Sequence, residues 1–160
     1  MNRLFTRSLI VLALALVPTI GHAEFSKEDS YAGSEDGVEA AFNDAAKLIE
    51  EHSYRDAIAK LESLLETRPD YADALNLMGF SYRKLGDYDN AFKYYKLALE
   101  NNPLHRGANE YMGEAYLEKG DLASAEKNME TLKRACPLGC PEIDKLQKAM
   151  DDFTAKGRQG

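Results

Sequence analysis

Apolar residues recur every three or four positions along most of the chain, in stretches that stop at glycine or proline. This period is typical of amphipathic helices with one buried face. Gly86 and Gly120 suit helix ends with left-handed backbone. Ser53, Asp87 and Asp121 stand at expected N-caps. The pattern predicts an all-α protein with helices at 37–51, 54–67, 71–85, 88–101, 105–119 and 122–135.

The sequence also repeats itself at a spacing of 34 residues, a period that indicates a solenoid. The matched pairs are Ala74/Ala108, Met78/Met112, Gly79/Gly113, Tyr82/Tyr116, Gly86/Gly120, Asp87/Asp121, Ala91/Ala125, Lys93/Lys127 and Pro103/Pro137. Gly79 and Gly113 would let paired helices approach closely. The prolines would close the second helix of each pair.

This order of large, small, tyrosine and proline positions resembles the tetratricopeptide repeat. Residues 72–105 fit the pattern best. Residues 106–139 depart from it at Asn109 and Leu132, and residues 38–71 are degenerate in their first helix. A terminal repeat is expected to deviate, because one of its faces meets solvent. The resemblance implies a right-handed α-solenoid of three helix pairs that binds other proteins.

A further amphipathic helix is predicted over residues 140–155, with a tail at 156–160. Ile143, Leu146, Met150 and Phe153 share one face of it. Such a helix after the last repeat is expected to cap the open end of the solenoid. The alternative is a free helix that docks on a partner or a membrane.

The resemblance also implies a concave groove lined by the first helix of each repeat. The groove candidates are Phe42, Ile49, Asn76, Phe80, Arg83, Glu110 and Glu114. The two phenylalanines are candidates for anchoring apolar side chains of a partner, and Asn76 for holding an extended peptide by its amide. The two glutamates would favour a basic or amino-bearing ligand. Alternatively, Phe42 packs under the preceding segment and Phe80 against a neighbouring helix.

One known use of the family is not supported by the sequence. Chaperone-binding members grip a terminal carboxylate with Lys and Arg, at positions that here carry Phe42, Gly107 and Tyr111. The carboxylate clamp is therefore missing.

Cys136 and Cys140 flank a Pro/Gly turn, where two cysteines can reach disulfide distance. A disulfide would join the last repeat to the final helix. A thiol at a helix N-terminus can instead be reactive, and Cys-xxx-Cys-Pro resembles a motif of copper chaperones with a thioredoxin fold. Their alternating strands and helices are not predicted here. We expect a structural disulfide and no metal site, with thiol redox or copper handling as the alternative.

Residues 1–23 have the three parts of a secretory signal peptide. Arg3 and Arg7 precede an apolar stretch at 9–17, and small residues lead to a cut after Ala23. The stretch is about half the ~20 residues that a membrane span needs, and an uncleaved anchor is the alternative. We expect a periplasmic protein without a membrane span, preceded by a flexible acidic lead-in over residues 24–37.

Composition narrows the function further. A formal net charge of -7 argues against nucleic-acid partners. The chain has no glycine-rich phosphate loop, zinc-binding histidine pair or nucleophile motif, so neither an enzyme nor a cofactor is expected. The first hypothesis is an adaptor or scaffold for envelope proteins. The second is a thiol-redox or copper-handling protein that uses Cys136 and Cys140. Self-association is possible, because three repeats leave open ends.

Overall fold

The computed structural model describes residues 34–157, and these residues form seven helices and no strand. The helices are α2 (Glu35–Glu50), α3 (Tyr54–Thr67), α4 (Ala72–Lys84), α5 (Tyr88–Asn101), α6 (Arg106–Glu118), α7 (Leu122–Ala135) and α8 (Pro141–Gly157). The predicted all-α fold is confirmed. The signal-peptide prediction lies outside the described residues.

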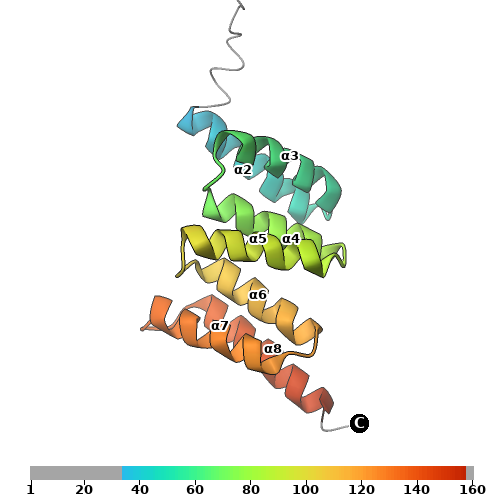
Figure 1. The fold of residues 1–160 in the computed structure, drawn as a ribbon, viewed down its shortest axis with the longest axis vertical. Helices are drawn as coiled ribbons and strands as arrows, with labels where there is room; N and C mark the ends of the chain where they lie inside the picture. Colours follow the sequence, from blue (N-terminus) through green and yellow to red (C-terminus); the bar gives the residue numbers. More distant parts are fainter. Residues whose placement is uncertain (1–33, 158–160) are drawn as a thin grey trace, which may run out of the picture.

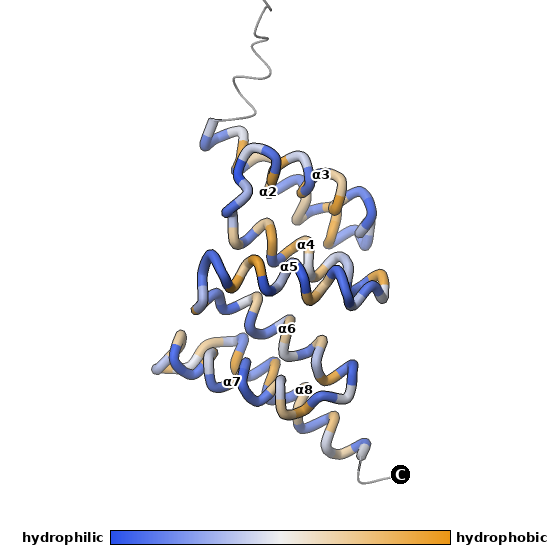
Figure 2. Tube along the Cα trace, in the orientation of Figure 1, coloured by the Kyte–Doolittle hydropathy of each residue, from blue (hydrophilic) through white to orange (hydrophobic). Residues whose placement is uncertain are grey.

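The helices pack as consecutive pairs, α2 with α3, α4 with α5 and α6 with α7. Figure 1 shows the pairs stacked in chain order along the long axis of the molecule, ending at α8. Figure 2 shows hydrophobic positions interspersed with hydrophilic ones along each helix, as expected of helices with one buried face. Each pair covers the apolar face of the next, which explains why a helical array of this kind is stable without a central core.

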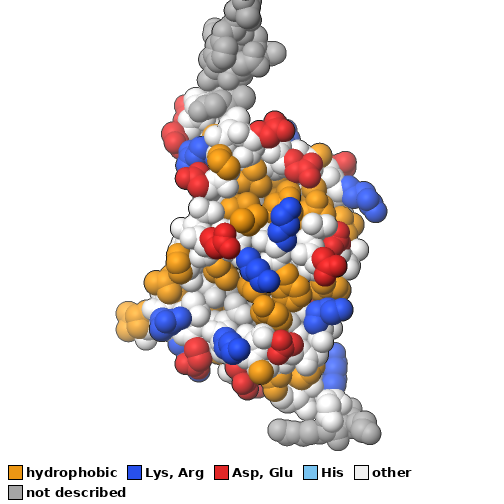
Figure 3. Space-filling model, in the orientation of Figure 1, with side chains coloured by type: hydrophobic (Ala, Val, Ile, Leu, Met, Phe, Trp, Pro, Cys, Tyr) orange, Lys and Arg blue, Asp and Glu red, His pale blue; other side chains and the backbone are white. Residues whose placement is uncertain are grey.

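Buried side chains fill every joint of the stack. Leu61 and Met78 lie between the first and second pairs, and Tyr95 and Met112 between the second and third. The face shown in Figure 3 carries both signs of charge around hydrophobic side chains at its middle. The described residues therefore form a continuous apolar interior under a mixed polar surface.

Gly79 allows α4 and α5 to pack at short distance. A Cβ atom at this position would lie 2.6 Å from two ring carbons of Tyr95, and Tyr95 is fully buried. Since the ring has no free space to move into, only glycine fits here. The prediction that small residues set the helix spacing thus has a specific partner, the Tyr95 ring.

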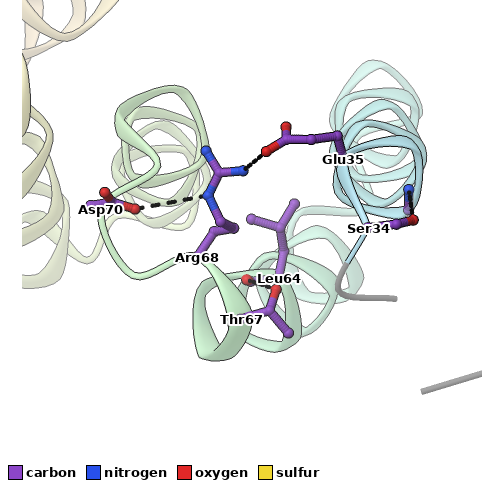
Figure 4. Close-up of polar contacts among 7 residues, drawn as sticks. Ser34, Glu35, Leu64, Thr67, Arg68 and Asp70 are labelled. Carbon is purple, nitrogen blue, oxygen red and sulfur yellow. Dashed lines mark hydrogen bonds and ion pairs between the residues drawn. The ribbon is translucent and has the colours of Figure 1, made fainter. Parts of the chain in front are cut away.

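The first helix begins earlier than predicted. Glu35 to Gly37 were assigned to the flexible lead-in, but they form the first turn of α2. The Ser34 side chain accepts a hydrogen bond from the Gly37 N–H at 3.2 Å, and two acidic residues favour the positive helix end. Figure 4 shows Glu35 reaching Arg68 across the helix pair, at 2.8 Å. These local contacts correct the predicted boundary.

The same turn is made by different residues in the three repeats. Gly86 and Gly120 have φ angles of 80° and 81°, whereas the first repeat has His52 with φ 61°. The degenerate repeat therefore keeps the left-handed turn without glycine, at some conformational cost. His105, by contrast, caps α6, because its Nδ1 accepts a hydrogen bond from the Ala108 N–H at 3.0 Å.

The final helix α8 packs against both α6 and α7, as predicted for a cap. Leu146 is fully buried, while Ile143, Met150 and Phe153 pack at the edges of the same cluster. No helix among the described residues is long and apolar enough to cross a membrane.

Candidate groove between the first helices and the C-terminal helix

The first helices of the repeats lie next to one another, because α4 contacts both α2 and α6. A cleft of about 420 Å³ opens between α4, the α5–α6 turn, α6 and α8. It is lined by Asp73, Asn76, Leu77, Asn102, Leu104, His105, Arg106, Gly107, Glu110, Tyr111, Glu142 and Lys145. Two of the predicted groove residues, Asn76 and Glu110, belong to this lining.

Asn76 lies at the wall of the cleft and is only 6 % exposed. Its Oδ1 atom is buried and has no hydrogen-bond partner among the described residues. Gly107 faces it, and a Cβ there would lie 3.0 Å from the Asn76 Nδ2 atom. The glycine thus leaves room for the Asn76 amide at the wall of the cleft. A buried acceptor without a partner indicates a place where a bound molecule can donate a hydrogen bond.

Arg83 does not point freely into the groove. Its guanidinium is buried and forms ion pairs with Glu114 at 2.8 Å and Glu118 at 3.1 Å. It also lies 5.6 Å from the ring centroids of Phe80 and Tyr111. Arg83 therefore links the second repeat to the third rather than offering a free positive charge to a ligand.

The two predicted aromatic anchors have different surroundings. Phe80 is half-buried, 6.4 Å from the Tyr54 ring and 4.8 Å from the Tyr111 ring. These three rings form a row from the start of α3 through α4 to α6. Phe42 packs on Tyr71, with 5.4 Å between ring centroids. Both phenylalanines contact neighbouring elements and both keep some exposed area, as does Ile49.

The two groove glutamates already have cationic partners within the chain. Glu110 is 2 % exposed, and Lys145 of α8 lies 3.4 Å from it. Glu114 is paired with Arg83. Burial raises the pKa of Glu110 to about 7, although Lys145 opposes that shift. The prediction that this pair forms an open acidic end is therefore revised.

The cysteines are joined in a disulfide, with Cα atoms 5.9 Å apart. The bond connects the end of α7 to the start of α8. No free cysteine remains in the described part of the chain. Glu142 lies close by, and one of its carboxylate oxygens and the two sulfurs are all within 4.8 Å of one another.

Residues 72–104 match the family model of the tetratricopeptide repeat. The chain is a tetratricopeptide-repeat protein. It is 31 % identical over 97 residues to the Hsp70-Hsp90 organizing protein of Triticum aestivum, a match that covers 61 % of this chain and 15 % of that protein. It is 32 % identical over 72 residues to tetratricopeptide repeat protein 14 of Mus musculus, covering 45 % of this chain and 9 % of the relative. The chain thus spans less than a sixth of either relative.

Solved structures share the fold of this tetratricopeptide-repeat protein. The type III secretion translocator chaperone SycD of Yersinia enterocolitica superposes with a TM-score of 0.68 at 20 % identity, covering 78 % of this chain and 96 % of that one. SycD in complex with a peptide of the translocator YopD gives 0.66 at 20 % identity, covering 78 % and 97 %. The C-terminal domain of a Plasmodium falciparum FK506-binding protein gives 0.60 at 13 % identity, covering 86 % and 98 %.

Sequence reasoning missed the contribution of α8 to this groove. Glu142 and Lys145 line the cleft, but the sequence placed their helix only as an end cap. The pairing of His105 with Asp73, 2.9 Å apart, was also missed. The available signal was the spacing of Glu142 and Lys145, which puts both on one side of the polar face of α8.

The buried Glu110 leads to a pH-dependent prediction for this tetratricopeptide-repeat protein. Its folded pKa of about 7 exceeds the ordinary 4.5, so the unfolded chain loses this proton first as pH rises. The stability contributed by protonated Glu110 is present below pH 4.5 and lost as pH passes 7. We expect Glu110→Gln to gain about 1–3 kcal/mol of unfolding free energy relative to wild type between pH 5 and pH 8.

Urea denaturation at several pH values measures this difference. Asp144→Asn removes an exposed carboxylate from α8 and is the matched control, with little pH-dependent gain expected. A constant offset between Glu110→Gln and wild type across this pH range contradicts the assignment.

Proposed function

We propose that this protein is a non-enzymatic adaptor that holds an extended segment of a partner protein in the groove formed by α4, α6 and α8. The single observation that carries the proposal is the buried, unpaired Asn76 Oδ1 atom in the wall of the 420 Å³ cleft. A backbone N–H or side-chain donor of a bound segment would satisfy it.

The aromatic row of Tyr54, Phe80 and Tyr111 supports the same proposal. Phe80 keeps exposed area beside the cleft while its neighbours hold the ring in place. A rigid aromatic side chain of this kind is suited to anchor an apolar side chain of a partner, because little conformational entropy is lost on binding. A peptide complex of a structure with the same fold, SycD with a segment of YopD, is compatible with this mode.

The family offers a second mode of binding, in which Lys and Arg clamp a terminal carboxylate. The corresponding positions here carry Phe42, Gly107 and Tyr111, none of which is a cation. We therefore propose recognition of an internal segment rather than of a chain terminus.

We further propose that the protein acts in the periplasm. The basic start, short apolar stretch and small residues before the cut after Ala23 support export. A disulfide between Cys136 and Cys140 is compatible with an oxidising compartment. Cell fractionation with intact-mass measurement tests this, and the expected mass is that of a chain beginning at Glu24.

The thiol-redox or copper-handling alternative is not advanced. The two sulfurs are bonded to each other, so the structure holds the oxidised form of the pair and shows no free thiolate among residues 34–157. Intact mass with and without reductant, followed by alkylation, checks this. Ready reduction accompanied by copper uptake would revive the alternative.

The groove assignment is tested by replacing Phe80 with alanine. We expect about tenfold weaker capture of partner proteins, because a central aromatic anchor is lost. A photocrosslinking residue at Leu77, which lines the cleft, reports the capture by mass spectrometry. Phe92→Ala is the matched control. That ring is also half-buried, but it lies on α5 and packs on Tyr116, outside the row of Tyr54, Phe80 and Tyr111.

Circular dichroism on each variant separates binding from folding. The proposal fails if Phe80→Ala and Phe92→Ala capture the same proteins to the same extent as wild type. It also fails if a photocrosslinker at the exposed Lys96 of α5 captures the same proteins as one at Leu77.

A further inference from the structure

The cleft presents two buried hydrogen-bond acceptors that have no partner in the described part of the chain. One is Asn76 Oδ1 of α4 and the other is Glu142 Oε2 of α8. Both residues line the same cleft, one from α4 and the other from α8. Most buried acceptors in folded proteins have a hydrogen-bond partner, and a donor group of a bound molecule could supply one to each of these two atoms.

The charged side chains around the cleft indicate whether the donor group of a bound molecule is cationic or neutral. Asp73, Glu110 and Glu142 contribute carboxylates to the lining. Asp73 is satisfied by His105, whose Nε2 faces it at 2.9 Å, and Glu110 is satisfied by Lys145 at 3.4 Å. Glu142 forms no ion pair among residues 34–157, and the nearby Lys145, whose pKa the Glu142 charge helps to raise, is paired with Glu110. Arg106 also lines the cleft, but it is an exposed side chain.

We propose that the cleft binds a basic side chain, the ammonium of a lysine or the guanidinium of an arginine, carried by the partner segment. This inference rests on the proposed function and specifies which residue type the groove selects. The cation would donate to Glu142 Oε2 and Asn76 Oδ1. A carboxylate or phosphate cannot replace it, because both orphan atoms are acceptors and would repel an anion.

The remaining lining suits the aliphatic stem of such a side chain. Leu77, Leu104 and Tyr111 line the same cleft, and Leu104 is 49 % exposed. Lysine and arginine bury their methylene stems along apolar surface while the charged end meets polar partners. The Tyr111 ring also provides an aromatic neighbour for the cation. The cleft therefore has an apolar side for the stem and acceptors for the head.

The sequence had assigned recognition of a basic group to Glu110 and Glu114, on α6. The structure moves it to α8, because the α6 carboxylates are held by Lys145 and Arg83. The C-terminal helix is then a part of the binding surface as well as a cap. Glu142, which would bind the cation, lies in the first turn of α8. The disulfide next to it connects this turn to the end of α7.

Nuclear magnetic resonance on the ¹⁵N-labelled protein tests the site with small probes. The probes are Nα-acetyl-lysine methylamide and Nα-acetyl-arginine methylamide, with Nα-acetyl-norleucine methylamide as the uncharged match. We expect the Asn76 side-chain amide signals to shift in a saturable way with a basic probe, and not with norleucine. Comparing the Asn76 shifts produced by the lysine and arginine probes shows which of the two side chains the cleft prefers.

Glu142→Gln keeps the size of the side chain and removes its charge, and is expected to weaken the basic probe by about tenfold. Asp144→Asn is the matched control. It removes the same charge from the same first turn of α8, outside the cleft lining, and is expected to weaken the probe less than about twofold. Equal weakening by the two variants overturns the proposal, as does an equal Asn76 shift with norleucine.

Selection of peptides from a random library separates this inference from the proposed function. Selected peptides that share a lysine or arginine and no longer bind the Phe80→Ala variant support both the proposed function and this inference. Peptides that lose binding in Phe80→Ala but need no basic residue overturn the inference and leave the proposed function standing. A failure to select any groove-binding peptide overturns the proposed function. The probe titration then decides alone whether the cleft binds a basic side chain.

Discussion

Arg83→Ala is expected to lower the free energy of unfolding by about 2–4 kcal/mol, one of the two largest effects predicted for a single substitution in this protein. The Arg83 side chain is 3 % exposed and bridges α4 to Glu114 and Glu118 of α6. Its removal leaves Glu114, which is 24 % exposed, without a cation in a partly buried position. The rings of Phe80 and Tyr111 lose the same guanidinium.

Urea denaturation followed by circular dichroism measures the change. Glu118→Gln is the comparison, because the Glu118 side chain is 42 % exposed and its carboxylate keeps contact with solvent. Pairs of that kind contribute about 0–1 kcal/mol, so the variant is expected to remain close to wild type. Arg83→Met keeps much of the volume and is expected to lie between alanine and wild type. An Arg83→Ala midpoint equal to that of Glu118→Gln would show that the bridge is not structural.

Leu146→Ala is expected to cost about 2–5 kcal/mol. Leu146 is fully buried between Leu132 and Leu117. It also lies against Gly113, where a Cβ would be 2.8 Å from its methyl carbons. With a glycine below it and helices on both sides, the cavity left by alanine has no side chain that can fill it.

Hydrogen exchange tells how this cost is distributed. Because α8 packs mainly on α6 and α7 among the described helices, part of the loss is expected to appear as faster exchange throughout α8, with α4 and α5 unaffected. Lys148→Ala, an exposed change on the same helix, is the control. Unchanged protection of α8 in Leu146→Ala would contradict the packing described for this helix.

The fold was predictable because each repeat carries local signals that agree with one another. The helix starts at Tyr54, Tyr88 and Leu122 were predicted to the residue, since caps or turns precede them. The start of α2 was not, because Ser34 stands in a polar stretch that resembles a linker. His52 was also unpredictable as a turn residue, since nothing in a single sequence marks a histidine with positive φ.

The candidate site was predictable only in part. Asn76 and Phe80 follow from their places in the repeat, because the fold fixes which positions of α4 point toward the groove. The pairing of Arg83 with Glu114 and of Glu110 with Lys145 depends on side chains from different elements meeting, which no local pattern specifies. A sequence lists charges along the chain, whereas their neutralisation is a property of the assembled structure.

The bridge made by Arg83 has a mechanical consequence. The joint between the second and third pairs is held by a buried ion pair and by His105 with Asp73. The joint between the first and second pairs is packed by the Phe42–Tyr71 contact and by apolar side chains such as Leu61 and Met78, and no ion pair joins these two pairs among residues 34–157. Apolar packing is non-directional, so the first joint constrains the angle between its helix pairs less than the ion pairs of the second joint do. We therefore expect any change of groove width on binding to occur between α2 and α4 rather than between α4 and α6.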